Sequence, residues 1–394
     1  MSKEINDVPS RAALRLARRV CVKAGTSVVA NDDGRPSLTR MAAIVEQIAE
    51  LTRQGVEVVF VSSGAVGMGK RVLRQQGRLR MTLKDMHQHQ EQGGAADEAI
   101  MDRSSKHGPS RGSLRRIPST GSFTSMLQEQ QRPQTLMEKK KTYDSACAAA
   151  GQFEMMNLYN SLFTQVDVSA SQILVTQSDF VDEQRLNNLS YSIDRLLSLG
   201  IVPIINENDA VSANTGYTDD HVFSDNDSLA ALCARSFGAE VLLLLTDVDG
   251  VYDSSPKENP NAKLLSFYQD TTEVSIGKKS THGRGGMAAK IDAAMSAVET
   301  GSSCVACVVA SGADLNCIRA VLGASPAHGS RGTLFACPGS DLEAQALADS
   351  AGDNQVSYSA CGRPVHLSVL LYGRCRFILL KSRPVLSVME PLPC

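Results

Sequence analysis

Lysines, acidic residues, amides and glycine-rich turns recur just after the apolar segments of this sequence. These groups are Lys23, Gly25, Thr26 and Ser27; Ser62, Ser63 and Gly64; Asn206, Glu207, Asn208 and Asp209; Asp225, Asn226 and Asp227; Thr246, Asp247 and Asp249; and Arg284, Gly285, Gly286 and Lys290. Fixed cations and backbone N–H donors of this kind stabilise the negative charge that spreads over a phosphoryl group during its transfer. The set therefore indicates phosphoryl-transfer chemistry.

Two lysines and one aspartate carry the sharpest hypothesis. Lys23 and Lys290 can supply the fixed cations, and Asp227 would hold both ammonium groups in position. A carboxylate acceptor is already ionised at neutral pH, so such a reaction needs no general base. Taken singly, each motif is better explained as a turn or a helix cap. Their joint occurrence at the ends of so many strands favours a shared site.

Three other motifs suggest different chemistry, and we disfavour each. Residues 64–71 (GAVGMGKR) match a P-loop except that Arg71 replaces the Ser or Thr that binds Mg²⁺, so Lys70 is better read as an exposed helix residue. Cys304 and Cys307 form one CxxC inside an apolar run, without the second pair of a zinc site. TDVDGVY lacks the later acidic ligand of a calcium loop. No metal-ligating residue is therefore assigned.

Apolar strands alternate with amphipathic helices along most of the chain. The strands are expected at 20–29 with a break at Gly25, 56–63, 171–176, 201–205, 240–247, 303–310 and 331–336. The helices are expected at 37–55, from Gly64 onward, and at 144–165, 182–200, 226–238 and 285–301. This alternation predicts an α/β fold, a three-layer αβα sandwich with a mainly parallel central sheet. Ligands of such sheets bind at the carboxyl ends of the strands, where the polar groups fall.

Two regions interrupt this rhythm. An insert at 80–142, rich in Gln, Ser, Gly and charge, cannot bury enough apolar surface to order itself and is expected to be disordered. Its serines near 115–119 (RRIPS) could accept phosphate. The domain is expected to span 18–336, preceded by an extension at 1–17 and followed by a tail at 337–394 of unassigned function.

The bulk composition excludes several classes of protein. A net charge of -2 gives no general attraction to nucleic acid or to an anionic membrane, so neither partner is expected. No apolar segment approaches the roughly 20 residues that a transmembrane helix needs. The 10 cysteines have no regular spacing, and we expect reduced thiols and a cytoplasmic location.

Several motifs together resemble the amino acid kinase family. They are VKAGTSVV, VSSGAVGMGK, AAAGQ, INENDAV, DNDSLAAL, LLLLTDVDGVYDSSP, GGMAAK and GTLF. The resemblance covers roughly residues 18–336 apart from the insert, and it is strongest to the branch that phosphorylates L-glutamate. It implies the amino acid kinase fold, ATP with Mg²⁺, and the product glutamyl 5-phosphate, the first step of proline synthesis.

The resemblance also implies roles for individual residues. Lys23 and Lys290 would stabilise the transferring phosphoryl group, and Asp227 would orient them. The residues implied to bind glutamate and line the phosphate site beside it are Ser63, Gly64, Asp209 and Asn226. Those implied to bind ATP are Lys23, Gly25, Thr246, Asp247, Arg284, Gly285, Gly286, Met287 and Lys290.

Free proline is implied as a feedback inhibitor, and association into a homo-oligomer is expected. The insert is far longer than the family's connection at this place, and the tail is too short for a reductase half, which favours a single-activity kinase. Two alternatives stay open. One is a family member of the aspartate or acetylglutamate type, and the other is a non-catalytic regulatory relative.

Overall fold

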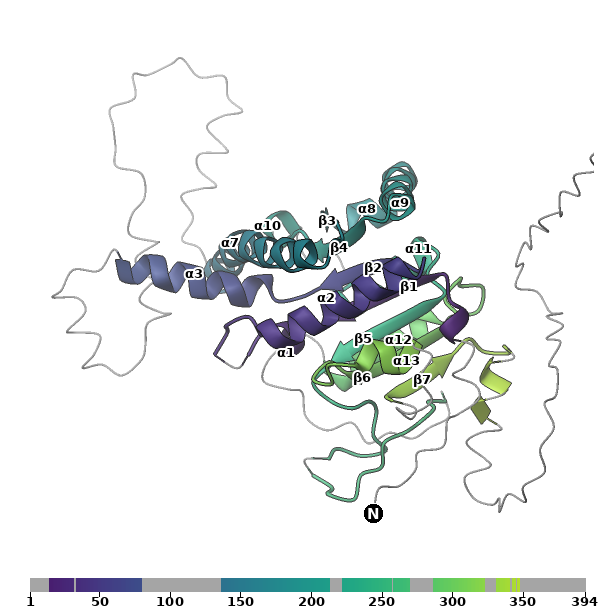
Figure 1. Ribbon diagram of the computed structural model, residues 1–394. Coiled ribbons are helices and arrows are strands. Elements are labelled where there is room, and N and C mark those ends of the chain that lie inside the picture. Colours follow the sequence, from purple (N-terminus) through teal and green to yellow (C-terminus); the bar gives the residue numbers. More distant parts are fainter. Residues whose placement is uncertain are drawn as a thin grey trace, which may run out of the picture. The chain divides into compact units, whose positions relative to one another are not determined.

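In the part of the chain that the structure describes, seven strands form one sheet (Figure 1). The computed structural model describes residues 14–31, 33–79, 136–212, 222–256, 258–269, 286–322, 331–340, 342–344 and 346–347. The strands are β1 (Arg19–Ala24), β2 (Glu57–Ser62), β3 (Ala170–Val175), β4 (Val202–Glu207), β5 (Val241–Thr246), β6 (Ala306–Ser311) and β7 (Thr333–Ala336). Their order is β3-β4-β2-β1-β5-β6-β7, and all neighbours are parallel except β6 and β7. The mainly parallel sheet is confirmed.

Helices cover both faces of the sheet, which makes the three layers predicted for the fold. They are α1 (Thr26–Val29), α2 (Leu38–Arg53), α3 (Ala65–Leu79), α7 (Leu136–Gln165), α8 (Ser178–Val181), α9 (Glu183–Ser198), α10 (Asp209–Ser212), α11 (Asn226–Ser236), α12 (Met287–Ala297) and α13 (Cys317–Leu322). One apolar core joins the sheet to α1, α2, α3, α7 and α13. A second core joins the opposite face to α8, α9, α11 and α12.

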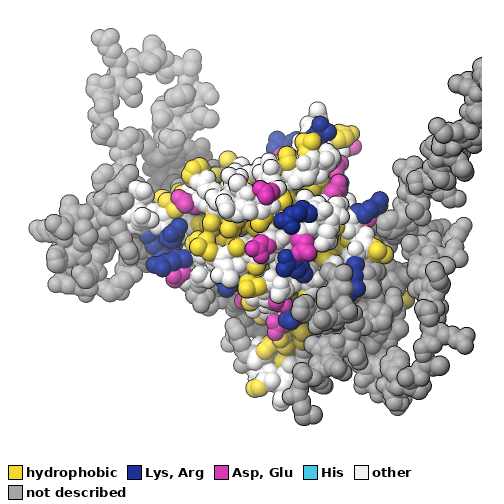
Figure 2. Space-filling model, in the orientation of Figure 1, with side chains coloured by type: hydrophobic (Ala, Val, Ile, Leu, Met, Phe, Trp, Pro, Cys, Tyr) yellow, Lys and Arg dark blue, Asp and Glu magenta, His cyan; other side chains and the backbone are white. Residues whose placement is uncertain are grey.

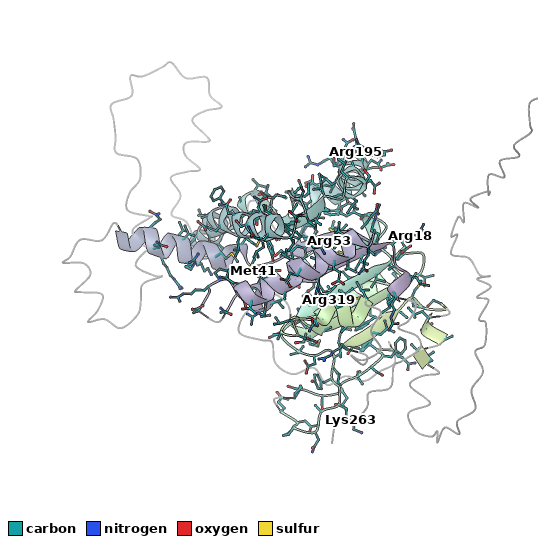
Figure 3. The ribbon with its side chains drawn as sticks, viewed as in Figure 1. Arg18, Met41, Arg53, Arg195, Lys263 and Arg319 are labelled. Carbon is teal, nitrogen blue, oxygen red and sulfur yellow. The ribbon has the colours of Figure 1, made fainter. Side chains whose placement is uncertain are left out.

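The helices of the first face are also tied to one another by polar contacts. Arg319 Nε of α13 donates to Glu50 Oε2 of α2 at 2.5 Å, and Arg53 Nη2 donates to Val166 O at 3.4 Å (Figure 3). These side chains are largely exposed, so they contribute less to stability than the apolar core beneath them.

The two-residue period of β1 decides which side chain faces which layer. Val20, Val22 and Ala24 point into the first core, whereas Cys21 points into the second. Lys23 shares the face of Cys21, so its ammonium group is directed beneath α11 instead of into solvent. The strand thus carries a cation into the interior at its carboxyl end.

Two expectations about local structure were wrong. Residues 26–29 are helical, because the chain turns at Gly25 and the β-branched residues after it pack as α1. Helix α7 begins at Leu136, so the last part of the predicted insert is regular helix. The rest of the insert, Arg284 and Gly285, and the tail beyond residue 347 lie outside the described residues.

The glycines of the sequence that resembles a P-loop serve helix packing. Helices α3 and α7 lie side by side (Figure 1) and cross so closely that a Cβ on Gly69 would collide with the carbonyl of Cys147. A Cβ on Gly151 would likewise collide with Ala65 O. Lys70 Nζ lies 3.3 Å from Asp144 Oδ1 of α7. Residues 65–71 are therefore the first two turns of helix α3, packed on α7, and not a P-loop.

The surface and the thiols agree with the bulk composition. Figure 2 shows positive and negative side chains interspersed with apolar ones on the face it draws. Of the helices in the described part of the chain, none combines the length and apolarity needed to cross a membrane. The described cysteines are all buried, and burial raises the pKa of Cys304 to about 12, which disfavours metal binding or redox chemistry at the CxxC.

Candidate active site

The candidate site lies where β1 and β5 end. β1 lies between β2 and β5 in the sheet. The chain passes from β1 to β2 in one direction across the sheet, and from β5 to β6 in the opposite direction. Parallel sheets open a crevice at such a reversal, at the carboxyl ends of the strands. Gly25 N donates to Leu245 O at 3.2 Å, so the turn after β1 lies directly against the end of β5.

One carboxylate at this edge contacts two lysines. Lys23 Nζ lies 2.5 Å from Asp227 Oδ1, and Lys290 Nζ lies 2.6 Å from Asp227 Oδ2. Each lysine pairs with a different oxygen, so the aspartate spaces two ammonium groups that would otherwise repel. Lys23 comes from β1, Asp227 from the first turn of α11 and Lys290 from the first turn of α12. The fold brings together three residues that are remote in the sequence.

The pKa values reflect this arrangement. Burial lowers the pKa of Lys23, an effect that Asp227 opposes and Lys290 reinforces. Burial alone would raise the pKa of Asp227, but the two ammonium groups outweigh it and hold that pKa below its usual range. The carboxylate is therefore ionised at neutral pH. The three groups carry a net positive charge at a crevice, which suits an anionic ligand.

Two tight turns, at Gly25 and Gly64, lie at this edge of the sheet. A Cβ on Gly25 would lie 3.6 Å from Lys23 Nζ, so this turn borders the ammonium group. Gly64 has φ +111°, and a Cβ there would lie 2.7 Å from Val29 Cγ2 of α1. Only glycine adopts that φ without strain and leaves room for Val29. The turn after β2 is thereby held against α1, beside the turn after β1.

A row of amide side chains extends from this centre. Asn226 Nδ2 donates to Ser63 Oγ at 2.9 Å and to Asn206 Oδ1 at 3.0 Å. Asn206 Nδ2 in turn donates to Gln152 Oε1 at 2.8 Å. Every bond of the Asn226–Asn206–Gln152 chain runs in the same direction, from an amide nitrogen to the oxygen of the next residue.

The direction of the chain leaves opposite groups at its two ends. Gln152 is only 7% exposed, yet no atom of the described residues accepts a hydrogen bond from its Nε2. A buried donor left unpaired costs about 1–3 kcal/mol, so a ligand that accepts from it is favoured. At the other end, nothing in the described part of the chain donates to Asn226 Oδ1. The array therefore offers an acceptor at Asn226 and a donor at Gln152.

The other side of the crevice has the features of a nucleotide site. Thr246 is buried at the end of β5, and its Oγ1 donates to Oδ1 of the exposed Asp247 at 3.0 Å. Gly286 is the N-cap of α12 and has no side chain to cap that helix. Met287 and Lys290 lie in its first turn. An uncapped helix N-terminus presents free N–H groups and a positive dipole to a phosphate.

Comparison with known proteins agrees with this geometry. The model of the amino acid kinase family matches residues 18–311. The chain belongs to this family. It is 38% identical over 360 residues to Delta-1-pyrroline-5-carboxylate synthase of Solanum lycopersicum, with 90% of this chain and 42% of that protein covered. It therefore spans less than half of that relative's length.

Shorter relatives are covered almost completely. Glutamate 5-kinase of Clostridium perfringens is 32% identical over 295 residues, which are 74% of this chain and 87% of that protein. Glutamate 5-kinase of Clostridium acetobutylicum is 32% identical over 321 residues, which are 80% of this chain and 94% of that protein.

Most of the residues that meet at the candidate site of this amino acid kinase were predicted from the sequence. Asn206 and Gln152 were not. Asn206 was noted only as a polar residue after a strand, and Gln152 only as the last letter of the AAAGQ motif. A polar residue that closes a small-residue helical run was the available signal for Gln152. Asp209 begins α10 at the same sheet edge, and that helix contacts α7.

The residues present fit Mg²⁺ only as part of a metal–nucleotide complex. Within the described ranges no cluster of three His, Cys, Asp or Glu side chains could hold a metal ion. Mg²⁺ commonly binds through one or two carboxylates together with substrate phosphates. Asp247 and Asp249 are exposed carboxylates just beyond β5, and Asp247 could serve in that way.

Proposed function

We propose that this protein transfers the γ-phosphoryl group of ATP to the side-chain carboxylate of L-glutamate, forming glutamyl 5-phosphate. The observation that carries the proposal is Asp227 bridging Lys23 and Lys290 beside an amide array suited to an amino acid. The names of the shorter relatives support glutamate as the substrate.

The proposed step needs charge stabilisation more than proton transfer. A carboxylate oxygen of glutamate attacks the γ-phosphorus as the bond from that phosphorus to the bridging oxygen of ADP breaks. No proton moves, because the nucleophile is ionised and the leaving group departs as an anion. Lys23 and Lys290 would neutralise the charge on the transferring group, and Asp227 would keep both in place before the substrates arrive. Bound Mg²⁺ would shield the phosphate charges further.

The amide array would hold the amino acid end of glutamate. The free oxygen of Asn226 can accept from its ammonium group, and the free nitrogen of Gln152 can donate to its α-carboxylate. Ser63 accepts from Asn226, so its own hydroxyl hydrogen can donate to the substrate. The array therefore offers an acceptor for an ammonium group and a donor for a carboxylate, the two charged groups at the amino acid end of glutamate.

The proposal is tested by glutamate-dependent consumption of ATP with Mg²⁺, with hydroxylamine present to trap the acyl phosphate. Hydroxamate should form with L-glutamate and not with L-aspartate or N-acetyl-L-glutamate. Lys290→Met should lower kcat about 10³-fold with little change in glutamate affinity, because the charge matters most in the transition state.

Other outcomes point to the open alternatives. Hydroxamate with aspartate or acetylglutamate instead would move the protein to another branch of the family. Folded protein that turns over none of the three would favour a non-catalytic regulatory relative. A Lys290→Met variant that loses glutamate binding but keeps its kcat would remove this lysine from the phosphoryl site.

Gln152→Glu tests the amide array directly. The substitution keeps an oxygen for Asn206 Nδ2 but replaces the unpaired donor by a negative oxygen, which would repel a carboxylate. We expect the KM for glutamate to rise about 100-fold, with the KM for ATP nearly unchanged. Steady-state kinetics measure both constants. Gln172→Glu on the exposed side of β3 is the matched control, and a Gln152→Glu variant as mild as that control would exclude Gln152 from the substrate site.

Regulation, assembly and location belong to the same proposal. L-proline added at subsaturating glutamate should inhibit if it acts as a feedback inhibitor, and sedimentation of the purified chain reports the expected homo-oligomer. Asp209 is proposed as a further glutamate ligand, and Gly25, Thr246 and Asp247 as ATP ligands together with residues 284–290. The location is proposed to be cytoplasmic.

A further inference from the structure

We propose that Gln177 is a positioning residue for this site. Its side-chain amide fixes the chain segment that enters α11, and with it Asn226 and Asp227, in the arrangement that binds substrate. The choice of substrate for testing this inference rests on the proposed function. Gln177 lies two residues beyond β3 and belongs to none of the motifs that suggested a site.

The anchor is formed by hydrogen bonds from one side chain to two consecutive backbone units. Gln177 Oε1 accepts from Val222 N at 2.8 Å and from Phe223 N at 3.2 Å, and its Nε2 donates to Phe223 O at 2.5 Å. A primary amide can accept and donate at the same time, which no apolar or carboxylate side chain can do. The Gln177 side chain thus replaces the backbone partner that a further strand would supply.

The anchor itself stands on a rigid turn. Gln177 O accepts from Phe180 N at 3.1 Å at the start of α8. Asp179 Oδ2 accepts from Thr176 N at 2.6 Å and from Thr176 Oγ1 at 2.8 Å, and Arg185 pairs with its other oxygen. The segment 222–223 is therefore tied to the end of β3 through a turn that is itself held by several hydrogen bonds.

The tie is transmitted to the site over a very short length of chain. Phe223 is 3% exposed and packs edge-to-face on Phe180, with ring centroids 5.9 Å apart. Two residues later, Asp225 caps α11 by accepting from Asp227 N and Ser228 N. Since one residue separates the buried ring from the cap, displacing the first displaces the second. The first turn of α11 carries both Asn226 and Asp227.

Removing the anchor should act on substrate binding before it acts on the chemical step. Without Gln177, only a fraction of the molecules would have the segment that precedes α11 in its ordered arrangement. Glutamate would bind only to those molecules. The apparent KM then rises by the reciprocal of the fraction, whereas the saturated complex reacts as before. A residue that merely stabilised the fold would lower the melting temperature and leave the KM of the folded protein unchanged.

The test is Gln177→Met, which preserves the length of the side chain and removes all three hydrogen bonds. We expect the KM for glutamate to rise about tenfold, with kcat within about twofold of wild type. Hydrogen exchange of the substrate-free protein should become faster at the amides of residues 222–226. Gln172→Met, an exposed glutamine on β3, is the matched control and should change neither.

Each outcome decides the matter. An unchanged KM, or a fall in kcat at constant KM, would overturn the proposal. If Gln177→Met fails to fold, Gln177→Glu keeps an acceptor oxygen for Val222 N and Phe223 N but sets a negative oxygen against Phe223 O. It should then also raise the KM, and an unchanged KM would again contradict the idea. A wild type without glutamate kinase activity would refute the proposed function, while exchange at 222–226 would still test the anchor.

Discussion

Replacing Asp227 by asparagine is expected to lower kcat about 10³-fold and to destabilise the fold by about 3 kcal/mol at neutral pH. The carboxylate is 4% exposed and pairs with Lys23 and Lys290 through separate oxygens. The asparagine amide can accept from one ammonium group but turns its own N–H donors toward the other. Two cations then remain close together without a counter-charge, and neither is placed for the transferring phosphoryl group.

The loss of stability in Asp227→Asn should depend on pH in a defined direction. Without Asp227, Lys23 is buried beside another cation, so its folded-state pKa falls further below the value of about 10.4 in the unfolded chain. Between those two pKa values the unfolded state binds more protons, so stability rises with pH. The stability deficit of Asp227→Asn should therefore shrink as pH rises from 7 toward about 10.

Wild type should show a separate dependence at acid pH. The folded-state pKa of Asp227 is depressed, so its contribution is complete above the unfolded value of about 3.9 and is lost as pH falls through the folded value. Urea denaturation at several pH values measures both effects. Asp292→Asn, an exposed aspartate of α12, is the control with no expected change. A deficit in Asp227→Asn that stayed constant with pH would contradict an unpaired buried lysine.

Gly151→Ala should destabilise the protein by about 3 kcal/mol, although Gly to Ala in a helix normally stabilises by up to about 1 kcal/mol. The reason is that helices α3 and α7 meet backbone to backbone at this crossing. The added Cβ would collide with Ala65 O and Gly69 N, and backbone cannot rotate away as a side chain can. The helices would have to separate, which opens the core beneath them.

The same substitution should impair the site. Residue 151 directly precedes Gln152, and Ala65 directly follows Gly64, so a shift of either helix displaces both sides of the substrate site. The KM for glutamate should rise in whatever folded protein remains. Thermal and urea unfolding together with kinetics measure the two effects.

Gly67→Ala is the matched control within α3. A Cβ at this position meets nothing within 4 Å, so the ordinary helix preference should prevail and stability should increase. Opposite effects of Gly67→Ala and Gly151→Ala on stability would not follow from helix propensity, which favours alanine at both positions. Equal behaviour of Gly67→Ala and Gly151→Ala would show that the helices do not cross as closely as described.

The sequence predicted the elements well where their periodicity is long and regular. The strands and the longer helices other than α7 were found within a few residues, because alternation of apolar side chains is a local property. The short helices α8, α10 and α13 were not predicted. The segment 26–29 was predicted as strand because β-branched residues favour strands. In the structure, Val29 is buried against Gly64 and Val28 against Gly312, and the segment forms a helical turn. The start of α7 was misplaced because its first turns are highly charged and lack a clear apolar face.

The candidate site was only partly predictable for a related reason. Residue types at the strand ends indicated which groups could take part, and Lys23, Asp227 and Lys290 do meet. The role proposed for Gln152 follows from its amide nitrogen, which has no acceptor among the described residues, and that proposed for Gln177 follows from its bonds to a backbone segment far along the chain. The Gln177 contact has no local signature, and the local signal for Gln152 was limited to its place at the end of the AAAGQ run.

By itself, the sequence determined the succession of strands and helices along the chain, the mainly parallel sheet and the types of residue that follow the strands. These features depend on neighbouring residues and on short periods of apolar side chains. Only the tertiary structure decided that one carboxylate contacts two lysines, that the amides of Asn226, Asn206 and Gln152 all point the same way, and that two glycines bring helices into backbone contact. Those features depend on distances between remote segments, which are set by how the two cores pack against the sheet.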